Sequence, residues 1–238
     1  MNRETYCLLE EFMLCSMDDA AHDKEHIYRV LYNALEIAKT EENVNYDVLI
    51  AACLLHDIGR KEQFENPALC HAIVGSEKAC QFLVTHGFEA FYAEQVKQCI
   101  RTHSYRKEET PQSLEAKILF DADKLDVAGA IGIARTLLYK GIVSEPLYSV
   151  LPNGVVSAGE NDSTPSFFQE YKYKLVNLYS SFYTEKATAI AKDRQHIAVA
   201  FYNKLYQEIN ASYQSGIDEL NNVLEDKLHT TALDTGSH

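Results

Sequence analysis

Apolar residues recur along most of the chain at intervals of three and four, the spacing that places them on one face of an α-helix. No segment reads as a credible strand, and no stretch repeats another. The pattern therefore predicts an all-α, single-domain helical bundle with no β-sheet core. The predicted helices cover residues 3–16, 23–38, 48–58, 68–87, 88–105, 113–123 and most of 167–212.

Local signals set several of the boundaries. Asp23 is a plausible cap for the second helix, Asp47 opens the third, and Ser113 caps the sixth. Gly59 can end the third helix because glycine tolerates the left-handed conformation that a C-cap needs. Residues 60–67 are strongly charged, and we expect them to form a loop between two helices.

The least regular part of the chain is rich in glycine and proline and covers residues 139–165. A long loop inside a compact domain is usually a lid or an insert. We expect one helical domain over residues 1–215 that contains this loop, followed by a flexible C-terminal tail over residues 216–238.

A histidine and a carboxylate stand together at the end of the most apolar helix. Residues 48–55 are all apolar, and His56 and Asp57 occupy the expected last turn. A carboxylate there is costly to bury without a cation. Neighbouring residues on a helix diverge by about 100°, so the pair can bind one ion only if other segments supply ligands. Such residues occur in segments 22–30 and 120–126.

Three motifs follow one another along the chain: His-x-x-Arg-Val at residues 26–30, Leu-Leu-His-Asp-Ile at residues 54–58 and Asp-Ala-Asp-Lys-Leu-Asp at residues 121–126. In this order they resemble the HD-domain metal-dependent phosphohydrolases, and most closely the small bacterial HD hydrolases. The resemblance extends from about residue 19 to about residue 208, and it implies an HD-type helical bundle.

The resemblance also implies a metal site. Matched residue by residue, the metal ligands of the family fall on His26, His56, Asp57 and Asp123. Asp121 and Asp126 are then partners of the ligands or surface acids, and His22 is a polar residue near the helix start. Two histidines and two aspartates suit Mn²⁺, with Fe²⁺, Ni²⁺, Co²⁺, Zn²⁺ or Mg²⁺ as other candidates.

Two further histidines lie between the His-Asp pair and the last aspartate, at His71 and His103. HD enzymes with two metals carry two histidines in this part of the chain. The two residues are therefore candidates for a second ion, for contacts to phosphate, or for structural roles.

The implied activity is attack of metal-bound water on a phosphoester or phosphoanhydride bond of a nucleotide or another small phosphorylated metabolite. The expected catalytic residues are Asp57, Lys124 and Arg60. Positive side chains near the ligands would offset charge that grows on the phosphoryl oxygens. The residues expected to bind the substrate are Arg60, Lys61, His71, His103, Arg106, Lys124 and Arg135. Arg135 can equally point to a surface carboxylate.

Two other functions stay open. Some HD proteins with six ligands hold two irons and oxidise their substrate, and His71 and His103 would complete such a set. An inactive HD domain that only binds a nucleotide is the other alternative. Its mark would be a broken ligand set, whereas all four positions are intact here.

The amino-acid composition limits the classes of molecule that the chain is expected to bind. The 22 basic and 35 acidic residues give a net charge of −13, which argues against binding a nucleic acid polymer through its phosphates. Neither a signal peptide nor a stretch apolar for long enough to span a bilayer is found. The six cysteines form no Cys-x-x-Cys pair, and they suit buried thiols in a reducing compartment. We expect a cytoplasmic protein with no membrane partner, and a homodimer remains open.

Overall fold

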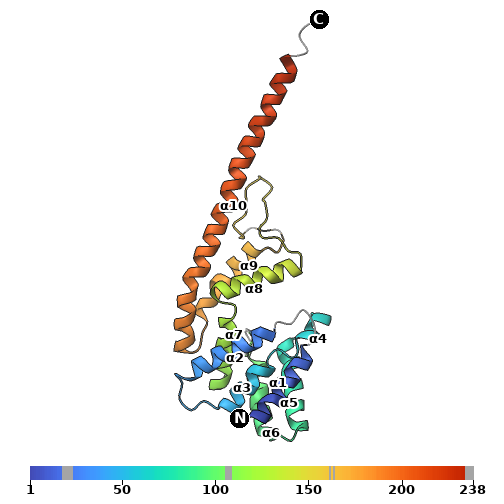
Figure 1. The fold of residues 1–238 in the computed structure, drawn as a ribbon, viewed down its shortest axis with the longest axis vertical. Helices are drawn as coiled ribbons and strands as arrows, with labels where there is room; N and C mark the ends of the chain where they lie inside the picture. The colour runs from blue at the N-terminus through green and yellow to red at the C-terminus, as the bar shows by residue number, and fades with distance from the viewer. Residues whose placement is uncertain (18–23, 105–108, 161, 163, 234–238) are drawn as a thin grey trace. The chain divides into compact units, whose positions relative to one another are not determined.

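The structure is a computed structural model (Figure 1) that describes residues 1–17, 24–104, 109–160, 162 and 164–233, with side chains described through residue 224. Within these residues the regular structure is helical, and the only β-type pairing is one isolated bridge between Val150 and Val156. This confirms the all-α prediction. The chain forms two compact units: Met1–Gly132 with Leu178–Arg194, and Ile133–Asn177 with Gln195–His238.

The first unit is built around one central helix. Its helices are α1 (Arg3–Ser16), α2 (Lys24–Ala38), α3 (Tyr46–Leu55), α4 (Arg60–Glu65), α5 (His71–Thr85), α6 (Ala90–Arg101) and α7 (Leu114–Leu125). The central helix is α3, which packs against α1, α2, α5, α6 and α7. From Val48 to Leu55, every residue except the half-buried Ile50 is buried. A helix that is apolar on all sides is usually surrounded by other parts of the protein. The C-terminal end of α3 therefore lies in the protein interior.

The end of α3 differs from the prediction. The helix stops at Leu55, His56 is its C-cap, and Gly59 has a φ of −99° rather than a left-handed conformation. A Cβ atom on Gly59 would lie 2.4 Å from the carbonyl oxygen of His71 and 2.5 Å from the amide nitrogen of Gly75. Glycine is needed here because the turn after α3 touches the backbone of α5. This close approach brings His71 to the His-Asp pair.

The charged stretch after Gly59 is also different. We expected a loop over residues 60–67, but Arg60–Glu65 form the short helix α4. Lys78 on α5 holds it in place, donating to the carbonyl of Ile58 (2.8 Å) and to a carboxylate oxygen of Glu62 (2.7 Å). Charged residues in this stretch therefore serve packing between α4 and α5 as well as solvation.

The capping predictions had mixed outcomes. Ser113 caps α7, accepting the amide of Ala116 (3.1 Å) as predicted. Asn45 caps α3 in place of Asp47, accepting the amide of Val48 (3.3 Å). Asp23, like His22, lies outside the described residues.

The second unit includes much of α8 (Gly129–Ile142), α9 (Phe167–Tyr173), part of the 3₁₀ segment η1 (Leu175–Ser180) and most of α10 (Glu185–Leu233). The helix α8 covers the first residues of the predicted irregular loop, so among the described residues the irregular part begins at residue 143. The expected boundary at residue 216 falls inside α10, which continues to Leu233. Stacked rings of Tyr171 and Tyr202, 4.0 Å apart, belong to the core of this unit.

The described residues bear on two predictions, one about membrane-spanning helices and one about the cysteines. No helix among them combines the length and the apolar character that a membrane crossing requires. All six cysteines are free, as predicted, although Cys7 and Cys15 are exposed rather than buried.

The close contact at Gly59 predicts a stability effect. Gly59→Ala should lower the free energy of unfolding by about 1–3 kcal/mol or more, because two backbone atoms would have to move. Gly216→Ala is the control, since nothing lies within 4 Å of the added methyl group. That variant should be neutral or slightly more stable, because alanine is a better helix former. Thermal unfolding followed by circular dichroism measures both, and equal melting temperatures for the two variants would contradict the packing argument.

Candidate metal centre

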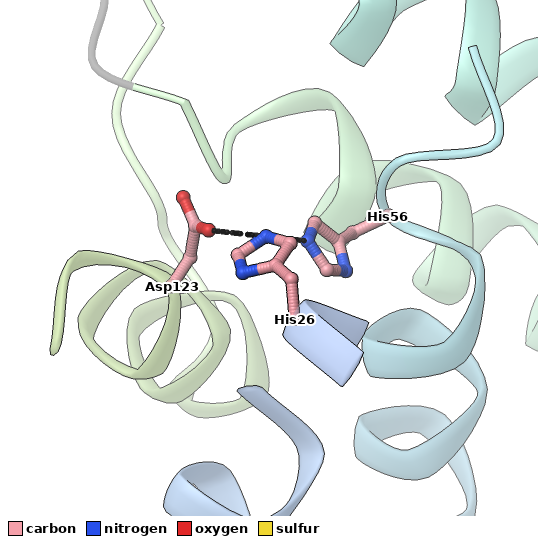
Figure 2. Close-up of side chains that lie close together, drawn as sticks. All are labelled: His26, His56 and Asp123. Atoms are coloured by element: carbon pink, nitrogen blue, oxygen red, sulfur yellow. Dashed lines mark hydrogen bonds and ion pairs between the residues drawn. The ribbon is translucent and has the colours of Figure 1, made fainter. Parts of the chain in front are cut away.

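His26, near the start of α2, is held by two acidic partners. It is buried, and its Nδ1–H donates to Asp126 Oδ2 over 2.7 Å, since a carboxylate can only accept. Asp126 in turn accepts from Arg29 Nε (2.7 Å) and Nη2 (3.0 Å). These contacts fix the imidazole so that Nε2 faces the interior. Nε2 lies 3.2 Å from Asp123 Oδ1, as Figure 2 shows.

His56 lies opposite His26 at the end of α3. Its Nδ1–H donates to the carbonyl of Cys53 over 2.8 Å. The last carbonyls of a helix have no intrahelical partner, which makes this one available to the ring. Nε2 of His56 is 3.3 Å from Nε2 of His26 (Figure 2). Burial lowers the pKa of His56 to about 4, so the ring is neutral at pH 7 and its Nε2 carries a lone pair.

Asp57 lies between two pairs of histidines. Its Oδ2 is 3.5 Å from His26 Nε2 and 3.7 Å from His56 Nε2. Its Oδ1 is 3.6 Å from both His71 Nε2 and His103 Nε2. The side chain is only 6% exposed, so one buried carboxylate faces four imidazole nitrogens.

The second pair of histidines is arranged like the first, with the two Nε2 atoms facing each other and each Nδ1 next to an oxygen acceptor. His71 and His103 have Nε2 atoms 3.2 Å apart. Nδ1 of His71 is 2.8 Å from Gln63 Oε1 on α4, and Nδ1 of His103 is 2.6 Å from the carbonyl of Ile100 at the end of α6. Both partners are oxygen acceptors, so each Nδ1 carries the hydrogen and each Nε2 is left to face Asp57.

Protonation follows from these contacts. Burial opposes a charge on His26, but its contacts with Asp123, Asp126 and Asp57 prevail and raise its pKa to about 10. Burial lowers the pKa of His71 to about 3. Burial by itself would raise the pKa of the Asp57 carboxyl, but the guanidinium of Arg60 and the neighbouring imidazoles hold it well below its usual range.

The donor set fits a divalent cation. Among the described residues, two groups of side chains have ligand atoms within 4.8 Å of one another. They are His26, His56 and Asp123, and His56, Asp57 and His103. Lone pairs of buried nitrogens that face each other at 3.2–3.3 Å repel unless a proton or a metal ion lies between them. Imidazole Nε2 atoms with their Nδ1–H groups bonded to acceptors are typical metal ligands.

The predicted cations lie in different surroundings. Arg60 Nε donates to Asp57 Oδ1 over 2.9 Å, and its side chain is 40% exposed. Lys61 is exposed on α4. Lys124 Nζ instead donates to the carbonyl of Ser181 over 2.9 Å, and burial lowers the pKa of Lys124 to about 8. Arg60 therefore contacts a candidate ligand directly.

Two predicted substrate residues are not placed at the centre. Arg106 lies outside the described residues. Arg135 belongs to the second unit, so its position relative to these histidines is not defined. Their predicted roles stay predictions.

The three aspartates of the third motif have separate roles. Asp123 faces His26, and Asp126 orients His26. Asp121 is fully buried and accepts from the amides of Tyr183 and Thr184 and from the Thr184 hydroxyl, at 2.7–3.1 Å. It therefore holds the segment that leads into α10.

Sequence reasoning missed two contributors. Arg29 is the arginine of the His-x-x-Arg motif, and its spacing of three from His26 signals a shared helix face. Gln63 gives no such signal, because the charged stretch over residues 60–67 predicts a loop, and a loop implies no shared helix face.

Comparison with known proteins gives several matches. The HD domain family model matches residues 24–128, which include all four candidate ligands. A predicted HD superfamily hydrolase from an uncultured Thermotogales bacterium is 31% identical, with a TM-score of 0.56, over 84% of this chain and 90% of that one. An HD-superfamily hydrolase from Bacillus thuringiensis is 28% identical, with a TM-score of 0.66, over 88% and 98%.

The uncharacterized protein YpgQ of Bacillus subtilis is also similar. It is 26% identical over 196 residues, which is 81% of this chain and 86% of YpgQ. The crystal structure of YpgQ in complex with ADP has 25% identity and a TM-score of 0.64, over 84% of this chain and 97% of that one.

The Asp126 contacts predict an effect on metal affinity. Asp126→Asn should weaken Mn²⁺ binding by about 10–100-fold, because the ring of His26 loses its charged partner. Isothermal titration calorimetry measures the affinity. Asp121→Asn on the same motif is the matched control, and it should lower the melting temperature while leaving Mn²⁺ affinity within about threefold of wild type. Equal affinities for Asp126→Asn and wild type would show that this partner does not orient the ring for metal binding.

Proposed function

Because the chain belongs to the HD superfamily of hydrolases, we propose that it is a metal-dependent phosphohydrolase that acts on a nucleotide or another small phosphorylated metabolite. The bond cleaved is a phosphoester or a phosphoanhydride. The observation that carries the proposal is the convergence of imidazole Nε2 atoms on the buried Asp57, with each Nδ1 bonded to an oxygen acceptor.

The ligands of the first ion would be His26, His56, Asp57 and Asp123. When bound, a divalent ion lowers the pKa of a coordinated water from 15.7 to about 7 and polarises a phosphoryl oxygen. Their mixed nitrogen and oxygen donors suit Mn²⁺ among the candidate metals.

Other side chains would act on the substrate. Arg60 has a partly exposed guanidinium next to Asp57, so it would bind a phosphoryl oxygen and offset the charge that grows there. Lys61, exposed on the same helix, would attract the phosphate chain. Lys124 would contribute positive charge beside Asp123 while the carbonyl of Ser181 holds its ammonium group.

Two facts support a nucleotide as the substrate. YpgQ, a similar protein, has been crystallised in complex with ADP. The net charge of −13 disfavours a long polyanion but leaves room for a small one whose charge is met locally by metal ions and Arg60.

We further propose a second ion between His71, His103 and Asp57 Oδ1. The two Nε2 atoms form the same kind of pair as His26 and His56, and each lies 3.6 Å from Asp57 Oδ1. Asp57 would therefore help to hold both ions. This six-ligand arrangement also favours the oxidative alternative as a second candidate function. Iron content together with substrate-dependent oxygen consumption would identify that activity.

The hydrolytic function predicts release of phosphate or pyrophosphate from at least one nucleotide in a panel tested with Mn²⁺. Asp57→Asn should reduce the rate by at least about a hundredfold, because it removes a charged ligand shared by both sites. Chelation of the metal should abolish the activity, and added Mn²⁺ should restore it. The control Asp193→Asn changes an exposed aspartate on α10 and should match wild type. Full activity in Asp57→Asn, or in the chelated protein, would rule out the proposed mechanism.

The second site predicts a change in metal content. Mn²⁺-loaded wild-type protein should hold two ions per chain, and His103→Ala should hold one, because the second site loses a ligand while the first is intact. The control His86→Ala removes an exposed histidine and should leave two. Inductively coupled plasma mass spectrometry measures the content. One ion per chain in the wild type and in His103→Ala would mean that His71 and His103 do not form a metal site.

A further inference from the structure

The short helix α4 has one edge directed at the metal centre. Arg60 at its start contacts Asp57, and Gln63 one turn later contacts His71. Because each residue of an α-helix advances by about 100°, these two side chains define the direction in which α4 faces the histidines.

Phe64 is the next side chain around the helix from this edge. It follows Arg60 by four residues, so it lies about 40° from Arg60 around the axis and about one turn further along it. Lys61 lies about 100° from Arg60 around the helix axis. Glu62 lies on the opposite side of the helix, where it contacts Lys78. Phe64 is therefore the α4 side chain that borders the arginine on the side away from Gln63.

The ring of Phe64 is exposed to an unusual extent for phenylalanine. The residue is 73% exposed and is not part of the hydrophobic core of the first unit. Single exposed apolar residues are common on protein surfaces, and Phe91 on α6 is equally exposed at 74%. What distinguishes Phe64 is its place, one helical turn from a guanidinium that contacts a candidate metal ligand.

We infer that Phe64 is a stacking platform for the base of a nucleotide whose phosphates lie at Arg60. This inference rests on the proposed function and narrows it to nucleoside phosphates rather than sugar phosphates or inorganic polyphosphates. Four residues of helix rise by about 6 Å, and the arginine and phenylalanine side chains extend the span toward the length of a nucleotide. Every base has a π-face, so a single phenylalanine accepts purines and pyrimidines alike.

The test compares two ligands that differ only by the nucleoside. The non-hydrolysable α,β-methylene-ADP carries a base, and methylenediphosphonate is its phosphorus group without one. Binding of both to the full-length protein with Mn²⁺ is measured by isothermal titration calorimetry, for wild type, Phe64→Ala, Phe64→Tyr and the control Phe91→Ala. Hydrolysis of the nucleotide panel is measured with the same four proteins.

The expected result is specific to one ligand and one position. Phe64→Ala should weaken the binding of α,β-methylene-ADP by about fivefold to a hundredfold, the usual range for loss of one stacked base. Methylenediphosphonate should bind all four proteins equally. Phe64→Tyr should retain wild-type affinity because it keeps the aromatic face, and Phe91→Ala should behave as wild type.

Failure of this inference differs from failure of the hydrolytic function. Equal effects of Phe64→Ala and Phe91→Ala, or equal wild-type affinity for the two ligands, would overturn the stacking role even if nucleotides are hydrolysed. Selective loss of α,β-methylene-ADP binding in Phe64→Ala would support it even if no hydrolysis is found, and the proposed function alone would then fail.

Discussion

Asp57 carries a negative charge in the interior of the first unit, and the neighbouring elements are arranged to compensate that charge. An ionised carboxylate taken out of water loses several kcal/mol of hydration free energy that its surroundings must restore. Here the side chain is 6% exposed and is met by Arg60 and by imidazoles on both sides. The enclosed helix α3 places it there, and the absent side chain of Gly59 lets α5 approach it.

The histidines around Asp57 are oriented by a common device. Each donates its Nδ1–H to an oxygen, and those oxygens come from separate elements of the fold. Two are main-chain carbonyls, of Cys53 near the end of α3 and of Ile100 near the end of α6. The other two are side chains, of Asp126 and Gln63. Nε2 atoms that converge on a buried carboxylate favour a cation between them, either a proton or a metal ion. The packing of the helices is in this way joined to the proposed chemistry.

The sequence is most informative where a strong apolar pattern ends in a residue that is energetically costly to bury. An apolar run that ends in His56 and Asp57 predicts both a buried helix and a need for further ligands, and the all-α class follows from spacing alone. The role of Gly59 is a contact with a segment twelve or more residues away, which local conformational preference does not reveal. The six residues of α4 are too few to show helical periodicity, so their charges predict a loop instead.

The most direct test of this account is the anomalous scattering of a crystal of the protein loaded with Mn²⁺. We expect a strong peak among His26, His56, Asp57 and Asp123, with ligand distances of roughly 2.0–2.3 Å, and a second peak on the other side of Asp57. Well-ordered side chains with no anomalous peak near Asp57, in a crystal that holds Mn²⁺ elsewhere, would contradict the claim that a metal ion compensates the buried carboxylate.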